Sequence, residues 1–431
     1  FHHLPKVRLC CSYNYICKKI NSHSLNKKNK LKIFNDPIYG FIRINDPLIL
    51  ELIETPYFQR LRRIAQVGLS SLVYPGAHHT RFHHALGCVH LMQQSISVLQ
   101  FKGVAISAAE SRALQIAILL HDIGHGPFSH AMEHSIIPNI SHETLSLKFM
   151  HILNDQFKGA LSLAISIFRG ESERLFFNQL VSSQLDVDRL DYLKRDSFYT
   201  GVAEGNINSE RLISMLNVVD QTLVIEEKGL YSVEKYLMAR RFMYWQVYLH
   251  KTGIAAEAIL IKIFERAKTL LKQGVLLQAS DALMYFLNQS DDIQLSEQTM
   301  EQFSKLDDTD IYAAIKTWSD HNDVVLSHLC VMILNRSLLK IKIKDTPFSE
   351  TKIASKTKLL EAAGYSKETW PYFVFSGTFS NLAYNPLNTP IYMIKKSGKK
   401  VNIATQLAPS FFEALSHKVE KYYICYPKKG F

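Results

Sequence analysis

Apolar side chains recur at helical spacing through the first two-thirds of the chain. Residues 47–68 carry this pattern with a start signal in the middle, which predicts two helices there. Ser107 and Glu110 form an S-x-x-E capping box ahead of ALQIAILLHD, so a buried helix is expected to end near His121. Longer amphipathic stretches without internal proline follow at 143–168, 171–195 and 232–271. The pattern therefore predicts a mainly helical body.

Two other regions have the alternation of β-strands. Residues 31–46 alternate apolar and polar positions around Asp36 and Gly40, which predicts a short hairpin. Beyond about residue 345, YFVFSG, PIYMIKKSG and KKVNIATQL combine β-branched and aromatic residues with Gly or Pro punctuation. The expected fold class is mainly α, with a helical core and a smaller mixed α/β C-terminal region. The expected organisation is a basic leader (1–31), the core (32–275) and a C-terminal region (276–431) with an oligomerisation or regulatory role.

Composition and charge refine this picture only slightly. The 431 residues suffice for one large or two ordinary domains, and 47% hydrophobic with 21% charged residues is typical of globular proteins. No apolar stretch is long enough to cross a bilayer, so no membrane partner is expected. The net charge of +11 is concentrated in residues 1–32, which hold eight Lys or Arg and no acid. A solvated leader accounts for this segment better than a functional basic arm does.

The cysteines do not point to a redox or thiolate metal site. They have no CxxC pair and no regular spacing, so a disulfide scaffold is not expected. The leader also lacks the arrangement of a secretory signal, because its cations are interleaved with its apolar residues. A reducing cytoplasm is therefore the expected location. The six cysteines are Cys10, Cys11, Cys17, Cys88, Cys330 and Cys425.

Histidines cluster in two segments, and the string HDIGHGPFSH (residues 121–130) is the most specific of them. Adjacent His121 and Asp122 at a helix end can turn toward one cation. An imidazole nitrogen and a carboxylate oxygen together suit Mn, Fe, Ni, Zn or Mg. His125 lies one turn further and can address a substrate beside the metal. A solvated or core histidine would explain any one of these residues alone, but the full string favours a metal site.

Two further segments can complete a coordination sphere. TRFHHALG offers His84, with Arg81 one turn earlier as a planar donor for phosphate oxygens. DVDRLDYLKRD places Asp188, Asp191 and Asp196 at helical spacings. Taken alone, that acidic segment is more typical of a salt-bridged surface. A metal site formed by His84, His121 and Asp122 would nevertheless need a further carboxylate, and this segment can supply it.

These strings resemble the HD-domain phosphohydrolases, and most closely the deoxynucleoside triphosphate (dNTP) triphosphohydrolase branch that includes the sterile-alpha-motif and HD-domain enzyme of animals. The resemblance runs in order through KIFNDPIYG, TPYFQRLRRIAQVG, YPGAHHTRFHHALG, HDIGHGPFSH, SHET and DVDRLDYLKRD to LHKTG at Gly253, and it is weak in the tail. It implies metal-dependent hydrolysis of dNTPs to deoxynucleoside and inorganic triphosphate. It also implies an activator nucleotide and a homo-oligomer, either a tetramer or a dimer.

Carried over by position, the resemblance implies roles for individual residues. The metal ligands would be His84, His121, Asp122 and Asp188. The residues lining the reacting phosphate would be His125, His130, His142 and Glu143, with His130 as proton donor to the leaving 5′ oxygen. Arg81 and Arg189 would bind phosphates, and Gln66, Tyr192, Asp196, Arg240 and Tyr248 would surround the sugar and base. The regulatory nucleotide would contact Lys32, Asn35, Glu54, Gln59 and Arg62. An amphipathic helix face explains Arg240 and Tyr248 equally well.

Several positions depart from the family pattern. His83 replaces an acid that often stands beside the metal-binding histidine, and Arg189 stands where the family often has Lys. Val67 and Leu249 differ from residues near the base in the animal enzyme, so base preference does not transfer. Glu54 is a longer acid at a regulatory position, which leaves the nature of any activator open.

Two alternative functions stay open at this point. One is an HD phosphohydrolase acting on another nucleotide, such as a monophosphate, an alarmone or a cyclic dinucleotide, although no GYP string supports the last. The other is a nucleotide- or nucleic-acid-binding regulator with weak activity. The arguments for weak nucleic-acid binding are the basic leader and the cluster Lys395, Lys396, Lys399 and Lys400.

Overall fold

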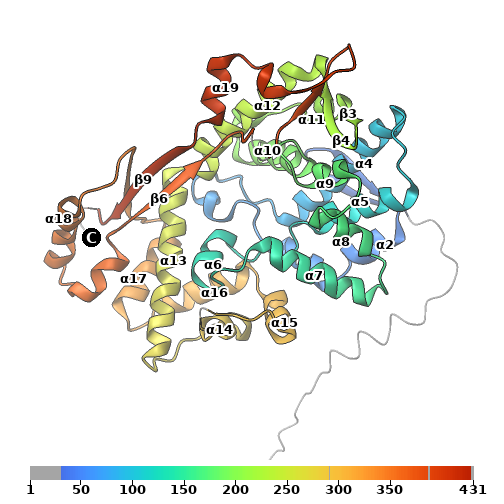
Figure 1. Cartoon of the computed structure of the whole chain (residues 1–431). Helices are drawn as coiled ribbons and strands as arrows, with labels where there is room; N and C mark the ends of the chain where they lie inside the picture. Colours follow the sequence, from blue (N-terminus) through green and yellow to red (C-terminus); the bar gives the residue numbers. More distant parts are fainter. Residues whose placement is uncertain (1–30, 291, 387–388, 429–431) are drawn as a thin grey trace, which may run out of the picture.

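The computed structural model describes residues 31–290, 292–386 and 389–428, without the side chains of His130 and His134 (Figure 1). The predicted basic leader thus lies outside the described residues except for Leu31, and so does the side chain of the proposed proton donor His130. Within this part of the chain, no helix is long and apolar enough to cross a membrane.

The chain enters the fold through the predicted hairpin. Strand β1 (Lys32–Asp36) pairs antiparallel with β2 (Gly40–Ile44). Asp36 closes the turn, because its Oδ1 accepts from the backbone N–H groups of Ile38 at 2.9 Å and Tyr39 at 3.0 Å. Gly40 has a φ of 72°, which favours glycine. The inner face of the hairpin is buried in the core.

Long helices then form the body. Helix α4 (Arg81–Phe101) is buried along most of its length and packs against α5 (Ala108–Leu120) and α10 (Val187–Thr200). The predicted capping box is present at the start of α5, where Ser107 and Glu110 bond each other's backbone N–H. The other elements up to residue 214 are α2 (Pro47–Ile53), α3 (Pro56–Gln59), η2 (Arg60–Arg63), η3 (Gly68–Leu72), α6 (Ser129–Ser135), α7 (His142–Gln156), α8 (Ser162–Arg169), α9 (Leu175–Val181), η4 (Ala203–Gly205) and α11 (Ser209–Ser214).

Each of the three long amphipathic stretches contains two helices. Residues 143–168 are divided between α7 and α8, because Lys158 and Gly159 adopt positive φ values of 55° and 86°. Residues 171–195 are divided between α9 and α10, and Asp186 caps the second helix. Residues 232–271 comprise α12 (Leu230–Met243), a π-helical turn η6 (Tyr244–Tyr248) and α13 (Lys251–Lys272). Both helices of each pair bury one face in the same core, so the apolar period continues across the turn.

Two small sheets follow, of which the first joins the body to the C-terminal region and the second lies within that region. The first has the order β3-β4-β7-β8, in which β4 pairs parallel with β7 and the other pairs are antiparallel. The second has the antiparallel order β5-β9-β6. The predicted strands correspond to β6 (Phe375–Asn381), β7 (Tyr392–Ile394) and β8 (Lys400–Asn402). Additional strands are β3 (Leu216–Val219), β4 (Thr222–Glu226), β5 (Lys340–Lys344) and β9 (Val419–Tyr426). The expected fold class, mainly α with a mixed tail, is confirmed.

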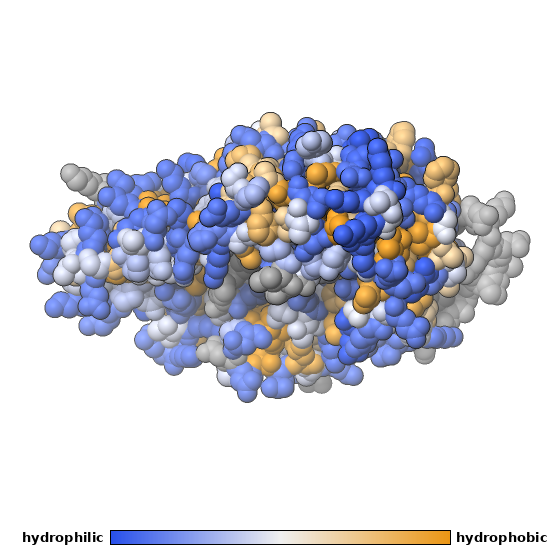
Figure 2. All heavy atoms as spheres, turned by 45° about the horizontal axis from the view of Figure 1, so that its top comes forward, coloured by the Kyte–Doolittle hydropathy of each residue, from blue (hydrophilic) through white to orange (hydrophobic). Residues whose placement is uncertain are grey.

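Helix α13 connects the body with the C-terminal region, because it contacts α6 of the body and α17 and β5 of the C-terminal region; α6 and α17 lie on its two sides in Figure 1. Arg60 also links the two regions, since its buried guanidinium donates to the carbonyls of Ile123 at 2.9 Å and Leu306 at 3.1 Å. Hydrophobic patches lie among hydrophilic residues on the face shown in Figure 2. The remaining elements are η5 (Glu227–Gly229), α14 (Asp281–Leu287), α15 (Glu297–Lys305), α16 (Asp308–Trp318), α17 (Val324–Leu334), α18 (Glu350–Ala362), η7 (Lys367–Tyr372), η8 (Ile403–Thr405) and α19 (Pro409–Ser416).

Candidate metal and phosphate site

The four proposed metal ligands converge from three elements. His84 lies on α4, His121 and Asp122 at the end of α5, and Asp188 in the first turn of α10. The Nε2 atom of His84 is 3.1 Å from Asp188 Oδ1 and 3.8 Å from Asp122 Oδ2. The Nε2 atom of His121 is 3.4 Å from Asp122 Oδ1 and 3.5 Å from Asp188 Oδ1. Two imidazole nitrogens and two carboxylates thus surround one point.

Burial opposes protonation of the two histidines, but the neighbouring acidic groups outweigh it and raise the pKa of both, so positive charge is favoured at that point. The Nδ1 atom of His121 lies 2.6 Å from the carbonyl of Ile118, and a proton there makes Nε2 the lone-pair atom. That Nε2 atom is buried and has no hydrogen-bond partner among the described residues. The Nδ1 atom of His84 lies 2.7 Å from Asp191, which likewise directs Nε2 inward. A set of two nitrogens and two oxygens suits a divalent transition metal or Mg.

Asp191 belongs to a buried chain of charges behind His84. Arg195 donates to both carboxylate oxygens of Asp191 at 2.9 and 3.0 Å, and to Asp36 of the hairpin at 2.7 Å. Burial opposes the charge of Asp191, but Arg195 and the hydrogen bond from His84 outweigh it and lower its pKa to about 2. The acidic segment is therefore salt-bridged, but inside the protein and not on its surface. Such partners fix the orientation of a ligating histidine.

The close packing around this chain requires a glycine. A Cβ atom at Gly87 would lie 2.0 Å from Asp191 Oδ1 and 2.3 Å from an Arg195 nitrogen. Helix α4 can therefore approach α10 closely only because position 87 has no side chain. The sequence alone gave Gly87 no role.

Cys88 lies beside His84, which sequence reasoning did not anticipate. Its Sγ atom is 3.6 Å from Nδ1 and 3.7 Å from Nε2. These nearly equal distances put the sulfur beside the ring and off the axis of either nitrogen. Burial raises the pKa of the Cys88 thiol, so it is protonated at neutral pH. Its Sγ atom also lies within 4.8 Å of one donor atom each of His84, His121 and Asp188, so Cys88 is close enough to join the cluster as a further donor.

Two arginines lie next to the cluster with spare donors. Arg81 donates through Nη1 to Asp122 Oδ2 at 2.6 Å, and Arg189 pairs with Asp186, the cap of α10. The Nε atoms of both are buried and have no acceptor in the described part of the chain. Planar guanidinium groups with free N–H bonds are suited to phosphate oxygens.

His125, in the loop after α5, stacks on His142 at the start of α7. The rings of His125 and His142 are 3.9 Å apart with an interplanar angle of 15°. The Nδ1 atom of His125 lies 2.8 Å from the hydroxyl of Ser129, whose own proton goes to the carbonyl of Gly126. Burial, followed by the charge of Arg81, lowers the pKa of His125 to about 3. His125 is therefore neutral at physiological pH.

Glu133 is the acid that contacts this pair. Its Oε1 atom lies 2.9 Å from Nδ1 of His142, whereas Glu143 is exposed in the first turn of α7. His125, Glu133 and His142 each place one donor atom within 4.8 Å of the others. Sequence reasoning missed Glu133 because it follows the HDIGHGPFSH string by three residues and has no distinguishing spacing of its own. Its position one turn beyond Ser129 and His130 was the available signal.

The residues assigned to sugar and base also lie near the cluster. Asp196 accepts from the hydroxyl of Tyr248 at 2.7 Å and lies 2.6 Å from His79 Nε2. The ring of Tyr192 is 6.0 Å from that of Tyr248 and 6.5 Å from that of His84. Tyr248 thus points toward a buried carboxylate, which favours a site residue over a solvated helix face.

Two further residues of that set have unpaired buried atoms. Arg240 donates to Gln184 at 2.9 Å, but its Nε atom has no acceptor among the described residues. The side-chain oxygen of Gln66 is buried and equally without a donor in the described ranges. Buried polar atoms of this kind are normally satisfied by water or a ligand.

The proposed regulatory residues gather only in part. Asn35 and Arg62 line a small cavity of about 100 Å³ beside the hairpin. Arg62 donates to Gln59 at 2.9 Å, and Lys32 lies over the ring of Phe34 at 5.9 Å. Glu54 is the exposed C-cap of α2 and is not among the residues lining this cavity.

His83, which replaces an acid of the family pattern, has a structural role. Its Nδ1 atom accepts from the backbone N–H of Thr80 at 3.2 Å and lies 2.9 Å from the Thr80 hydroxyl. Burial lowers the pKa of His83, so the ring stays neutral and can accept this bond. The substitution therefore preserves a helix cap at the start of α4.

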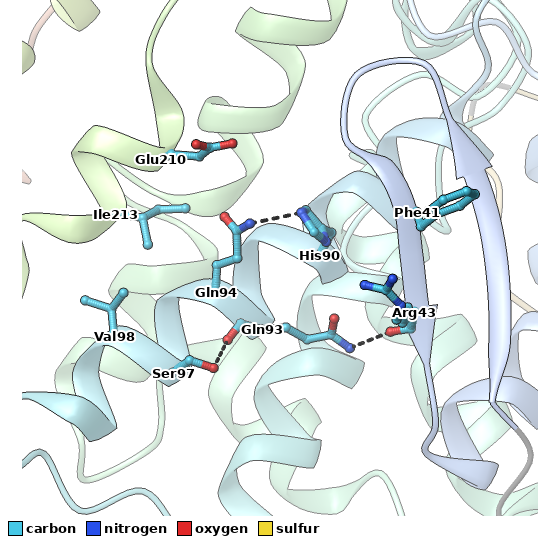
Figure 3. Close-up of a pocket in the computed structure, with 9 residues that line it drawn as sticks. All are labelled: Phe41, Arg43, His90, Gln93, Gln94, Ser97, Val98, Glu210 and Ile213. Carbon is cyan, nitrogen blue, oxygen red and sulfur yellow. Dashed lines mark hydrogen bonds between the residues drawn. The ribbon is translucent and has the colours of Figure 1, made fainter.

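A larger cavity than the one beside the hairpin lies elsewhere. A cavity of about 550 Å³ sits on the outer side of α4, between β2 and α11 (Figure 3). There Gln94 points toward His90, and Gln93 donates to the backbone carbonyl of Arg43 at 3.2 Å. None of the proposed site residues lines it. The candidate site is thus identified by the chemistry of its side chains and not by the size of its cavity.

Comparisons with known proteins agree with this geometry. Residues 81–196 match the family model of the HD domain, and residues 207–302 match that of the HD associated region. The uncharacterized protein YwfO of Bacillus subtilis is 32% identical over 408 residues, which is 91% of either chain. A solved phosphohydrolase structure from Bacteroides thetaiotaomicron superposes with a TM-score of 0.89 at 49% identity, over 93% of this chain and 100% of that one.

Relatives with a named activity match over a shorter range. The deoxynucleoside triphosphate triphosphohydrolase SAMHD1 homolog of Dictyostelium discoideum is 32% identical over 62% of this chain. SAMHD1 of Gallus gallus is 29% identical over 66% of it. These alignments cover only 54% and 52% of the two relatives. The match over the HD domain, its associated region and almost the full length of YwfO shows that the chain belongs to the HD-domain phosphohydrolase family.

Proposed function

We propose that this protein hydrolyses deoxynucleoside triphosphates to deoxynucleosides and inorganic triphosphate with the help of a metal ion. The observation that carries the proposal is the convergence of two histidines and two aspartates from α4, α5 and α10 beside two arginines with spare donors. The names of the Dictyostelium and chicken relatives support the choice of substrate.

His84, His121, Asp122 and Asp188 would hold the metal. A divalent cation among these donors supplies positive charge that acidifies water and polarises a phosphoryl group. The donor set is compatible with Mn, Fe, Ni, Zn or Mg. The buried lone pair of His121 Nε2 is the observation that best fits such an ion.

The protein's own side chains would orient the triphosphate. Arg81 and Arg189 offer N–H groups to its oxygens and offset its negative charge. Neutral His125, whose Nδ1 proton goes to Ser129, would offer Nε2 as an acceptor to a water beside the reacting phosphate, and Glu133 orients His142 beside it. His130 is proposed as the proton donor to the departing 5′ oxygen. Glu143 is exposed, so its proposed contact would be with the outer part of the substrate.

The nucleoside would occupy the space bounded by the aromatic and polar side chains next to the metal cluster. Asp196 and Gln66 offer acceptors to sugar hydroxyls, and the rings of Tyr192 and Tyr248 offer apolar surface. These residues, with Arg240, are proposed to hold sugar and base.

An activator nucleotide and a homo-oligomer are also proposed. The activator nucleotide is supported by the small cavity lined by Asn35 and Arg62, with Gln59 bound to Arg62, and the homo-oligomer is proposed on the family resemblance alone. Turnover that rises when a second nucleotide is added, together with a change of mass in light scattering, would support both. A monomeric protein whose rate of turnover is unchanged by any added second nucleotide would contradict both.

The decisive experiment identifies the products. Purified full-length protein, loaded in turn with Mn, Fe or Mg, is incubated with each dNTP and the products are resolved by ion-exchange chromatography. Deoxynucleoside and inorganic triphosphate in equal amounts are expected. Release of orthophosphate or pyrophosphate in their place would contradict the proposal and favour an HD enzyme acting on another nucleotide.

A further inference from the structure

The first residue of α16 reaches back to the segment that precedes α4. Asp308 accepts a hydrogen bond through Oδ2 from the backbone N–H of Ala65 at 2.8 Å. Ala65 forms a β-bridge with Thr80, which immediately precedes Arg81. The C-terminal region thus places a carboxyl group at the backbone that carries Gln66 and Arg81, two residues proposed to bind substrate.

Buried polar atoms without partners gather around this bridge. They are Oδ1 of Asp308, Oε1 of Gln66 and Nε of Arg81, and none has a hydrogen-bond partner within residues 31–290, 292–386 and 389–428. Buried polar groups are almost always hydrogen-bonded to protein, water or a ligand. Three such atoms on adjoining segments indicate that the bridge borders the ligand-binding space.

The loop after α5 (residues 121–128) is also fixed to the C-terminal region, by packing. Tyr312, one turn beyond Asp308, contacts Phe128 edge-on at 5.5 Å between ring centroids. A Cβ atom at Gly126 would approach Phe303 of α15 to 3.3 Å. The position of Asp308 relative to the loop after α5 is therefore well defined.

The carboxyl group of Asp308 is in an unusual electrostatic environment. Burial raises its pKa to about 7, although the hydrogen bond from Ala65 and the charge of Arg81 oppose this rise. Its charge therefore changes within the physiological pH range. The charged and titratable groups that face it are Arg60 and Arg63 on η2, Arg81 on α4, Asp307 at the cap of α16 and Tyr312 on α16.

On the basis of the proposed function, we propose that Asp308 is a positioning residue for the phosphate-binding part of the site. Its hydrogen bond holds the Ala65–Gln66 backbone beside Arg81, and its negative charge opposes a phosphate bound there. Bound polyphosphate would in turn favour the protonated carboxyl, because like charges repel. Affinity for polyphosphate should therefore decrease as the pH rises through the titration of Asp308.

The test measures binding of inorganic tripolyphosphate to the metal-loaded, full-length protein by calorimetry at pH 6 and pH 8. Wild type, Asp308→Asn and Asp308→Ala are compared, with Asp320→Asn as a control at an exposed acid just beyond the same helix. The ratio of variant to wild-type affinity at one pH cancels the titration of the ligand itself. Binding does not require turnover, so the result does not depend on which nucleotide is hydrolysed.

The two variants separate the roles of charge and hydrogen bond. Asp308→Asn retains an acceptor for Ala65, so it should match wild type at pH 6 and bind about fivefold more tightly at pH 8. Asp308→Ala loses that acceptor and should bind several-fold more weakly than Asp308→Asn at both values. If Asp308→Ala does not fold, the pH dependence of Asp308→Asn still tests whether the charge of Asp308 lowers the affinity for tripolyphosphate.

The results that would contradict the role of Asp308 differ from those that would contradict the proposed function. An Asp308→Asn affinity ratio that is the same at pH 6 and pH 8, or no tripolyphosphate binding by wild type, would overturn the role of Asp308. The expected ratios without hydrolysis of any dNTP would reject the proposed function and retain the role of Asp308. Hydrolysis of dNTPs with a flat ratio would reject only the inference about Asp308.

Discussion

The loop that follows α5 is held from two sides by regions that use different chemistry. On one side, α4 and α10 surround His121 and Asp122 with imidazole and carboxylate groups. On the other side, the C-terminal region packs against the same loop, with Tyr312 against Phe128, and Arg60 of η2 joins the two by donating to the carbonyls of Ile123 and Leu306. The first kind of contact depends on residue identity and is visible as motifs. The second depends on shape and hydrogen bonding, which many sequences can satisfy.

The largest effect is expected from a substitution among the proposed metal ligands, on the side of the loop that faces α4 and α10. His121→Ala removes a proposed ligand and should abolish bound metal and lower turnover by about a thousandfold or more. His151→Ala, at an exposed histidine of α7, is the matched control and should change neither. Metal content is measured by mass spectrometry alongside product formation. Full metal stoichiometry in His121→Ala would contradict the ligand assignment.

The C-terminal side is tested through Arg60. Arg60→Met leaves the carbonyls of Ile123 and Leu306 without their donor, which should lower the free energy of unfolding by about 2 to 4 kcal/mol. Arg336→Met removes a bond to Leu72 at an exposed position and should cost under about 0.5 kcal/mol. Urea unfolding curves measure both. Equal stabilities for the two variants would show that Arg60 does not join the regions.

A smaller effect separates two acids near the stacked histidines. Glu133→Gln removes the charge that orients His142 and should lower the rate of hydrolysis about 10- to 100-fold with metal content unchanged. Glu143→Gln changes an exposed residue and should stay within about twofold of wild type. Steady-state kinetics distinguish them. The reverse order of effects would show that Glu143, as the family resemblance implies, and not Glu133 acts beside the reacting phosphate.

The smallest effect concerns the pH dependence of stability at Asp308. Its pKa is raised in the folded state, from 3.8 to about 7, so folding binds a proton between these values and stability falls as the pH rises. Asp308→Asn removes this loss and should gain on the order of 2 kcal/mol relative to wild type between pH 5 and pH 8. Thermal unfolding at the two pH values measures the difference. A constant difference between variant and wild type would show that Asp308 does not titrate in this range.

Local signals predicted the helical elements but not all their limits. The cap at Ser107 marked the start of α5, because a side chain bonds the adjacent backbone within four residues. The breaks at Lys158 and Asp186 were not predicted, since the apolar period continues across them. Strand β9 and the parallel pairing of β4 with β7 were not predicted either, because their partners are distant in the sequence: Lys340 of β5 pairs with Tyr426, and Val224 of β4 with Tyr392.

Sequence by itself determined the family, the mainly helical fold and the side chains proposed as ligands, because these follow from residue identity and short-range spacing. Tertiary structure decided that His84, His121, Asp122 and Asp188 meet at one point, and that the carboxyl of Asp308 lies next to Ala65. Distances between remote segments depend on how helices pack, and packing is the sum of many weak contacts spread over the chain. A short sequence motif therefore does not determine these distances.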